Sequence, residues 1–305
     1  MPDTNTLTAP PFFPGWRPLD VKAGDVRFAG VIGGDGPPVL LLHGYPQTHI
    51  AWRRVAPDLA TRHTVVIPDL PGYGASRPDE TLPRWTKRRV GDALVALMAA
   101  LGHPRFSVVG HDRGARAGYR LALDHPAMVN AYASLAVVPT LDAMASIDFR
   151  MAAKAFHWFL FAQPADLPER LLAADPDAFI NAALKQMTQG REFVETAAMD
   201  AYRAAFRQPS VRLAMIEDYR AAMDEDLVQD AADLAAGRKI QCPVLALWPE
   251  TEHVSGRPSP VEVWRRWAND VSGTATRGGH LQAEDAPAQV LAALGPFLAA
   301  AGRSG

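Results

Sequence analysis

Short apolar runs alternate with longer segments of helical periodicity over the first part of the chain. The runs are bounded by Pro, Gly or Asp, which is typical of buried strands between turns. Strands are predicted at Val26–Ile32, Pro38–Leu42, Thr64–Pro68, Phe106–Val109 and Ala131–Val138, and helices at Trp52–Thr61, Arg84–Leu101 and Gly114–Leu123. Such alternation predicts a parallel, doubly wound α/β sheet whose ligands bind beyond the carboxyl ends of the strands.

The alternation stops near residue 140 and resumes near residue 240. Between Leu141 and Gly237 the pattern is helical, for example at Met151–Phe161 and Pro209–Met223. Afterwards we expect strands at Pro243–Trp248 and Val271–Thr276, and helices near Pro260–Trp267 and at Pro287–Ala300. We therefore predict a core domain of residues 1–140 and 238–305, with residues 141–237 as a helical cap that forms a lid. Residues 1–17, rich in Pro and Thr, are expected to lie on the surface as an arm.

Composition and charge narrow the class of protein. A chain of 305 residues with 48% hydrophobic and 21% charged residues can form one large domain with an insertion. The net charge of −2 gives no reason to expect nucleic-acid or membrane binding. No signal-peptide layout or long apolar span occurs, and the single Cys242 precludes an internal disulfide. We expect a cytoplasmic protein with no nucleic-acid or membrane partner.

The strongest chemical signal is an aspartate between two glycines at the predicted junction of a strand and a helix, Gly110-x-Asp112-x-Gly114. This is the pattern of a nucleophile elbow, with aspartate where serine is usual. A carboxylate there cannot perform serine acyl transfer, but it can attack a saturated carbon and form an ester. Helix capping alone would explain an aspartate but would not require both glycines.

A histidine and a second loop complete this constellation. His280 follows two glycines after the last predicted strand, which is a suitable place for a general base. The loop that begins at His43 follows another strand, where the second half of an oxyanion hole usually forms. The expected backbone donors are the N–H groups of Tyr45 and Arg113, and His43 is expected to support the loop.

Several motifs together resemble the fluoroacetate (haloacetate) dehalogenases of the α/β-hydrolase superfamily, and the similarity covers nearly the whole chain. The motifs are Gly110-His-Asp-Arg-Gly-Ala-Arg116, His43-Gly-Tyr-Pro-Gln-Thr-His49, His157-Trp158 and Gly278-Gly-His280. The resemblance implies an α/β-hydrolase fold with a helical cap and a homodimer. It also implies that Asp112 displaces halide and that His280 activates water to hydrolyse the ester. No metal cluster or phosphate-cradling loop is evident, so no cofactor or metal is expected.

Two arginines fit an anionic substrate. Arg113 and Arg116 lie one and four residues after Asp112, so both emerge at the first turn of the following helix. Guanidinium groups can bind the substrate carboxylate in bidentate fashion and offset its repulsion from Asp112. One of the two could instead form a structural salt bridge.

The leaving group needs hydrogen-bond donors, because fluoride is strongly hydrated and costly to release into an apolar pocket. In the resemblance, His157 and Trp158 of the cap, with Tyr219, match the family's halide-binding residues. Their N–H and O–H groups would stabilise the charge as it develops.

One position departs from the family pattern. The acid that usually orients the histidine falls at Ala136, and no acid lies between Val129 and Leu141. Other members of the superfamily place this acid after the next sheet strand, where Glu250 and Glu252 occur here. Glu252 matches that pattern slightly better than Glu250, and either could also be a solvated loop charge.

Two other readings remain open. An epoxide hydrolase also uses an elbow aspartate and two cap tyrosines, for which Tyr202 and Tyr219 are candidates, but a neutral epoxide does not explain two elbow arginines. A binding protein, or an enzyme impaired by Ala136, would retain its ligand without turnover. A haloalkane dehalogenase fits less well, because that family typically has Trp and Asn where this chain has Arg113 and Tyr45.

Overall fold

The computed structural model describes residues 11–79, 84–252 and 256–302. Among these residues, nine strands form one sheet in the order β1-β2-β4-β3-β6-β7-β8-β9, with β5 paired to β2. Pairing is parallel from β4 to β9 and antiparallel where β2 meets β1, β4 and β5. The strands are β1 Arg17–Ala23, β2 Val26–Gly33, β3 Pro38–Leu42, β4 Thr64–Pro68, β5 Arg77–Pro78, β6 Phe106–His111, β7 Val129–Leu135, β8 Val244–Pro249 and β9 Val271–Thr276. The predicted α/β class and largely parallel sheet are confirmed.

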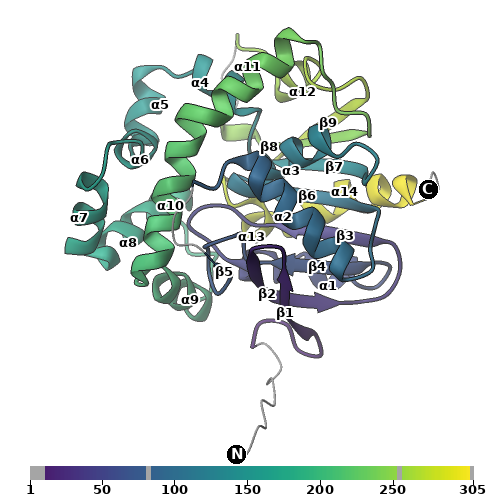
Figure 1. Ribbon diagram of the computed structural model, residues 1–305, viewed down its shortest axis with the longest axis horizontal. Helices are drawn as coiled ribbons and strands as arrows, with labels where there is room; N and C mark the ends of the chain where they lie inside the picture. The colour runs from purple at the N-terminus through teal and green to yellow at the C-terminus, as the bar shows by residue number, and fades with distance from the viewer. Residues whose placement is uncertain (1–10, 80–83, 253–255, 303–305) are drawn as a thin grey trace, which may run out of the picture.

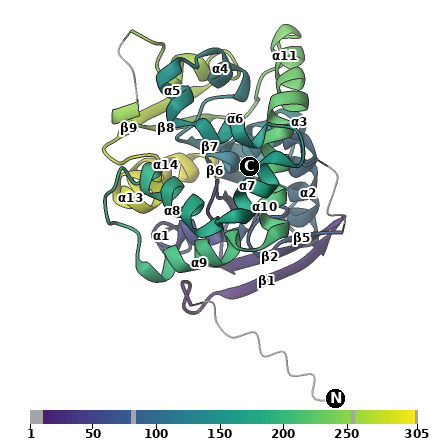
Figure 2. The same ribbon diagram turned by 90° about the vertical axis from the view of Figure 1, so that its left-hand side faces the viewer.

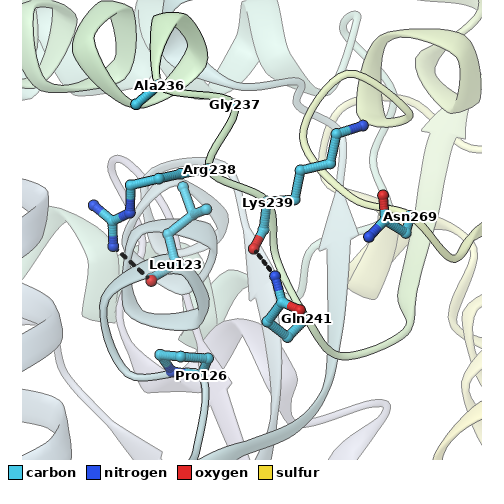
Figure 3. Close-up of a pocket in the computed structure, with 8 residues that line it drawn as sticks. All are labelled: Leu123, Pro126, Ala236, Gly237, Arg238, Lys239, Gln241 and Asn269. Carbon is cyan, nitrogen blue, oxygen red and sulfur yellow. Dashed lines mark hydrogen bonds between the residues drawn. The ribbon is translucent and has the colours of Figure 1, made fainter.

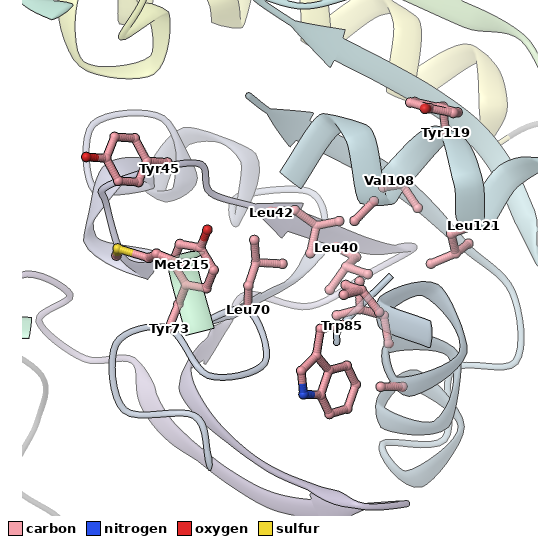
Figure 4. Close-up of a cluster of buried hydrophobic side chains, with 14 of the residues drawn as sticks. Leu40, Leu42, Tyr45, Leu70, Tyr73, Trp85, Val108, Tyr119, Leu121 and Met215 are labelled. Carbon is pink, nitrogen blue, oxygen red and sulfur yellow. The ribbon is translucent and has the colours of Figure 1, made fainter. Parts of the chain in front are cut away.

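The sheet is buried on both faces because successive side chains of a strand point to opposite sides. In β3, Leu40 and Leu42 join one apolar cluster, whereas Val39 and Leu41 join another. Figure 4 shows part of the first cluster, in which Met215, from a helix between β7 and β8, lies near Tyr45. One apolar core therefore extends from the sheet into that helical segment.

Helices from both clusters cover the two faces (Figure 1). The first cluster includes residues of α2 (Lys87–Ala100), α3 (Arg113–Asp124) and α12 (Pro260–Trp264), and the second includes η1 (His49–Trp52), α1 (Ala56–Leu59), α13 (Gln282–Asp285) and α14 (Pro287–Ala301). This is the doubly wound arrangement expected of a parallel sheet.

The chain between β7 and β8 is described throughout and contains helices but no sheet strand. In order these are α4 Thr140–Ala145, α5 Phe149–Lys154, α6 Phe156–Phe161, α7 Leu167–Ala174, α8 Pro176–Met187, α9 Thr196–Phe206, α10 Pro209–Ala221 and α11 Leu227–Ala235. A π-helical turn, η2 (Ala222–Asp226), joins α10 to α11. Figures 1 and 2 show these helices grouped beside the sheet, where the cap was expected; the domain boundaries 141–237 stay a prediction.

The structure corrects several local predictions. Residues 11–17 are not a surface arm, because Phe13 is fully buried against Trp16 and β1 begins at Arg17. β1 was not predicted because polar residues alternate with apolar ones along it. Its pairing with β2 stabilises it more than its own apolar content does. The helix predicted at Met151–Phe161 is divided at Ala155, and that predicted at Trp52–Thr61 is only one turn of α-helix after η1. Residues 1–10 lie outside the described part.

Within the described ranges, no helix has the length and apolar character that crossing a bilayer requires.

Candidate active site

Asp112 stands on a sharp turn between β6 and α3. Its backbone has φ 48° and ψ −116°, a conformation that non-glycine residues rarely adopt. The flanking glycines are required sterically: a Cβ on Gly110 would lie 2.5 Å from the Ala115 Cα, and one on Gly114 would lie 2.4 Å from the His43 carbonyl oxygen. The elbow predicted from the glycine spacing is therefore present.

Replacing Gly114 by alanine should destabilise the protein by about 3 kcal/mol, because the new methyl group would meet two backbone carbonyls rather than movable side chains. The matched control is Gly295→Ala in α14, where an added Cβ meets nothing within 4 Å. The gain in helix propensity is offset by Pro296, whose ring disfavours a Cβ on the residue before it, so that change should alter the stability by less than about 1 kcal/mol. Urea unfolding of both variants checks the contrast, and equal effects would contradict it.

The Asp112 carboxylate lies between a backbone donor and the predicted base. Its Oδ1 accepts the Tyr45 N–H at 2.9 Å, and its Oδ2 is 3.6 Å from Nε2 of His280. The side chain makes no capping hydrogen bond to α3, although Asp112 occupies the N-cap position. The carboxylate is thus oriented toward the carboxyl ends of the strands, and capping does not explain its presence.

The electrostatic environment favours the ionised form of Asp112. Burial works against its charge, but His280, followed by the Arg113 guanidinium, outweighs burial and holds the pKa of Asp112 well below its usual range. Asp112 is therefore a carboxylate at any pH near neutrality, as an attacking nucleophile must be.

The loop after β3 is held by His43. The Leu70 N–H donates to His43 Nε2 at 3.0 Å, so Nδ1 carries the proton and donates to the Gly44 carbonyl at 3.0 Å. A Cβ on Gly44 would lie 2.4 Å from the Cβ of Asp112, so only glycine lets the loop pass this close. His43 supports the loop, as predicted, and presents the Tyr45 N–H to Asp112.

The loop that carries His280 is fixed by a residue that sequence reasoning missed. His111 precedes Asp112, and its Nε2 donates to the His280 carbonyl at 2.8 Å. Burial lowers the pKa of His111 to about 4, so this imidazole is neutral and keeps one N–H for that bond. Nucleophile and base are therefore linked through the elbow itself.

The orienting acid is not at the usual position. Ala136 follows β7 with φ 67°, and its N–H donates to the Leu247 carbonyl. It lies at the correct edge of the sheet but carries only a methyl group. Glu250 and Glu252 belong to the 3-10 turn η3, directly after β8. Glu250 is exposed, and the side chain of Glu252 lies outside the described part.

The three predicted halide-binding side chains come together around Tyr45. His157 stacks on the Tyr45 ring at 5.1 Å, and Tyr219 is 5.5 Å from His157 and 6.4 Å from Trp158, measured between ring centroids. The hydroxyl groups of Tyr45 and Tyr219 are buried and have no hydrogen-bond partner among the described residues. Burial raises the pKa of Tyr219 well above its ordinary value, so its hydroxyl remains a donor.

His157 should make the protein less stable as the pH falls. Burial lowers its pKa to about 4, whereas in the unfolded chain it takes up a proton near pH 6.5. The unfolded state therefore binds more protons between these values, and up to about 3 kcal/mol of stability is lost as the pH falls through this range. His157→Phe should reduce that loss when urea unfolding is compared at pH 7 and pH 4.5. An unchanged pH dependence would contradict the buried, neutral imidazole.

The two arginines have different partners. Arg113 donates through Nε and Nη2 to the Asp218 carboxylate at 2.7 and 2.9 Å, and its guanidinium packs on Tyr219 at 4.3 Å. Asp218 also accepts from Tyr73 Oη at 2.9 Å and pairs with Lys87. We expected that one of the two arginines could form a structural salt bridge. Arg113 forms it, through the side of the guanidinium that carries Nε and Nη2. The acidic partner, Asp218, was not predicted.

Arg116 is buried to 1% exposure yet forms no ion pair within the described residues. Nη1 donates to the Thr140 hydroxyl at 3.0 Å and to the Val138 carbonyl at 3.2 Å, and the guanidinium lies over the Trp158 ring at 5.2 Å. Nε has no partner there. Burial lowers the pKa of Arg116, which reflects the cost of a charge removed from water. Within the described residues, the Arg116 guanidinium is thus held by neutral groups alone.

A family model described as the α/β hydrolase fold matches residues 37–280, from β3 through the His280 loop. The chain belongs to the α/β-hydrolase family. Its similarity to a dehalogenase agrees with this assignment, and the protein is a hydrolase of the α/β-hydrolase family.

The relatives of this α/β hydrolase include a dehalogenase and epoxide hydrolases. It is 36% identical to a fluoroacetate dehalogenase from a Burkholderia species, over 96% of this chain and 97% of the relative. It is 29% identical to a soluble epoxide hydrolase from a Corynebacterium species, over 87% and 91% of the two chains. A solved structure of a candidate epoxide hydrolase from Pseudomonas aeruginosa aligns with a TM-score of 0.92 at 49% identity, covering 96% of this chain and 98% of the other.

The second tyrosine considered for epoxide chemistry is already engaged in this hydrolase. Tyr202 Oη donates to Glu284 at 2.6 Å, and Glu284 also accepts from Gln47 and Arg53. This buried cluster connects α9 with the His43 loop and with α13, close behind His280. The Tyr202 hydroxyl is thus committed to a carboxylate, unlike that of Tyr219.

A separate hollow lies at the opposite edge of the sheet (Figure 3). It has a volume of about 520 Å³, and its lining includes Pro126, Gln241 and Asn269, which precede β7, β8 and β9. Asp112 follows the carboxyl end of β6, so this hollow is no part of the α/β-hydrolase site. No group of side chains suited to holding a metal ion occurs in the described ranges.

Proposed function

We propose that this hydrolase removes the halogen from haloacetates, converting fluoroacetate and water to glycolate and fluoride through an ester on Asp112. The observation that carries the proposal is Arg116, a buried cation without an acidic partner in the part of the chain that the structure describes. An uncompensated buried charge is costly, and a substrate carboxylate would compensate it. The similarity to a fluoroacetate dehalogenase supports the same choice.

In the first step, the Asp112 carboxylate attacks the carbon that bears the halogen. A carbon–oxygen bond forms, the carbon–halogen bond breaks, and halide leaves with the bonding electron pair. Arg116 binds the substrate carboxylate, and Arg113 adds positive charge while Asp218 holds it in place. These charges offset the repulsion between two carboxylates and align the carbon for attack.

In the second step, His280 takes a proton from water, and the resulting hydroxide attacks the carbonyl carbon of the ester. The Tyr45 N–H, already 2.9 Å from Asp112 Oδ1, stabilises the oxyanion, with the Arg113 N–H as the second donor. The bond between the Asp112 carbonyl carbon and the glycolate oxygen then breaks, and that oxygen takes up one proton as glycolate leaves. Asp112 is restored as a carboxylate with one oxygen from water, and His280 releases the second proton to solvent. In this proposal Glu252 orients His280, with Glu250 as the alternative from the same turn.

The aromatic group in the cap binds the departing halide. His157, Trp158 and Tyr219 supply N–H and O–H donors, and neither His157 nor Tyr219 carries charge near neutral pH. Neutral donors stabilise a small anion as it forms without holding it as tightly as a cation would. The engaged hydroxyl of Tyr202 favours this assignment over an epoxide hydrolase with two free cap tyrosines.

The test is product release from three substrates. Wild type is incubated with fluoroacetate, chloroacetate and styrene oxide, and free halide and diol are measured, with Asp112→Asn as the control. Halide from the two acetates and no diol is the expected result. Diol alone would favour the epoxide hydrolase, and neither product would favour a binding protein.

A further inference from the structure

Arg116 is connected to a distant carboxylate by a continuous chain of buried hydrogen bonds. Its Nη1 donates to Thr140 Oγ1 at 3.0 Å, Thr140 Oγ1 lies 3.0 Å from Tyr119 Oη, and Tyr119 Oη donates to Asp230 Oδ2 at 2.7 Å. All four side chains are at most 1% exposed. The chain runs from α3 through the start of α4 to α11, so it joins the core to the inserted helices.

The chemistry of its ends sets the direction of this chain. A guanidinium can only donate and a carboxylate can only accept, so the Tyr119 hydroxyl donates to Asp230 and the Thr140 hydroxyl donates to Tyr119. The Tyr119 oxygen also accepts the Thr140 backbone N–H at 3.3 Å. Asp230 remains the acceptor at assay pH because burial raises its pKa only to about 6. Its Oδ1 lies 3.9 Å from Arg120 Nη1, but Arg120 also pairs with Asp124 and Asp233, so its charge is shared among three acids. Each hydroxyl is therefore polarised the same way, which strengthens the chain as a unit.

We infer that Asp230 is the remote counter-charge of Arg116 and, through Tyr119 and Thr140, positions its guanidinium for the carboxylate of the substrate. Asp230 and Tyr119 are positioning residues, since neither touches the reacting atoms. The role toward substrate rests on the proposed function, whereas the link between Arg116 and Asp230 does not.

The physical benefit is an arginine fixed on one side and open on the other. The Thr140 and Val138 oxygens hold Nη1, and Trp158 covers one face of the guanidinium. A direct carboxylate partner would occupy the bidentate edge, as Asp218 does on Arg113. A counter-charge relayed over this distance offsets only a small part of the Arg116 charge and leaves that edge unfilled. The guanidinium is held in place in advance, so less ordering is needed when an anion binds.

Tyr119→Phe removes the hydroxyl that links Thr140 to Asp230 and keeps the aromatic ring. We expect its KM for chloroacetate to rise about tenfold with kcat within about twofold, because the lost interaction affects the binding of the carboxylate and not the attack. The matched control is Tyr132→Phe: this tyrosine is also fully buried and also packs on Trp264, but its hydroxyl donates to the Ala115 carbonyl. Its KM should be unchanged, although its melting temperature should fall by a similar amount.

Thr140→Val, a nearly isosteric change, removes the hydroxyl that links Arg116 to Tyr119. It tests the same inference if Tyr119→Phe does not fold. It should raise KM to the same extent, and the double variant should add nothing further, because both changes interrupt one chain. A KM shift equal to that of Tyr132→Phe, a fall in kcat at constant KM, or additive effects would overturn the inference.

Calorimetric titration with acetate separates this inference from the proposed function. Tyr119→Phe and Thr140→Val should each bind acetate about tenfold more weakly than wild type, whether or not halide is released. Acetate binding without dehalogenation by wild type would refute the proposed function alone. Equal acetate affinities in wild type and Tyr119→Phe would refute the role of Asp230.

Discussion

Replacing His280 by asparagine should leave a protein that releases one halide per chain and then stops with Asp112 esterified. Attack by the carboxylate needs no base. After His280 is replaced, Asp112 keeps the Arg113 guanidinium and the Tyr45 N–H, and both favour its ionised form. Hydrolysis of the ester does need one, and removing a general base typically costs about 10²–10⁴-fold in rate. After incubation with chloroacetate, mass spectrometry should find the peptide containing Asp112 heavier by one carboxymethyl group in place of a proton.

The control for that experiment is the double variant with Asp112→Asn, which should show neither the burst nor the mass increase. An unmodified Asp112 peptide after halide has been released would refute the covalent route. In wild type, a first turnover in labelled water with enzyme in excess should place the label in the Asp112 carboxylate. Label in glycolate alone would point instead to direct attack by water.

Replacing Arg116 by methionine should make the protein more stable and nearly inactive. The change removes a buried cation that has no acid partner in the described chain, and apolar replacement of buried charge can stabilise by about 1–3 kcal/mol. Losing bidentate binding of the substrate carboxylate should lower kcat/KM for chloroacetate by about 10²–10³-fold. Urea unfolding and halide release, measured on the same preparation, check both effects.

Arg113→Met is the matched variant on the same turn of α3, and its effect on stability should have the opposite sign. It removes the bidentate partner of buried Asp218, which should cost about 3 kcal/mol even though Lys87 and Tyr73 remain near that carboxylate. If both variants lost stability equally, Arg116 would be a structural residue. If Arg116→Met kept full activity, the proposed carboxylate site would be wrong.

Much of the core could be predicted because its strands are short, apolar and bounded by turn residues. β3, β4 and β9 were predicted to the residue, and the prediction for β6 omitted only its last residues, Gly110 and His111. β1 was missed because its side chains alternate as an edge strand does, and its partner β2 stabilises it. The Met151–Phe161 pattern has an unbroken apolar face, so the break at Ala155 is a result of packing that periodicity does not record.

The position of the elbow could be read from the chain because its requirement is local. Gly110 and Gly114 are needed by backbone contacts within a few residues of Asp112 and with the adjacent strand end. The place of His280 after the last strand follows from the same order of strands. The sequence also shows that Ala136 stands where the family usually has an acid. It does not show which other acid takes over that role, because several loops meet at that edge of the sheet.

The sequence by itself determined the α/β class, the elbow aspartate, and the two arginines and aromatic residues that could serve an anion. Only the tertiary structure decided that Arg113 pairs with Asp218, that Arg116 forms no ion pair among the described residues, and that Tyr119 links it to Asp230. Local patterns describe which face of a helix or strand is buried, because that depends on neighbours three or four residues away. Partners a hundred residues apart meet only through the packing of whole elements. This packing gives one of two neighbouring arginines an acidic partner, Asp218, and leaves the other among neutral groups in the described part of the chain.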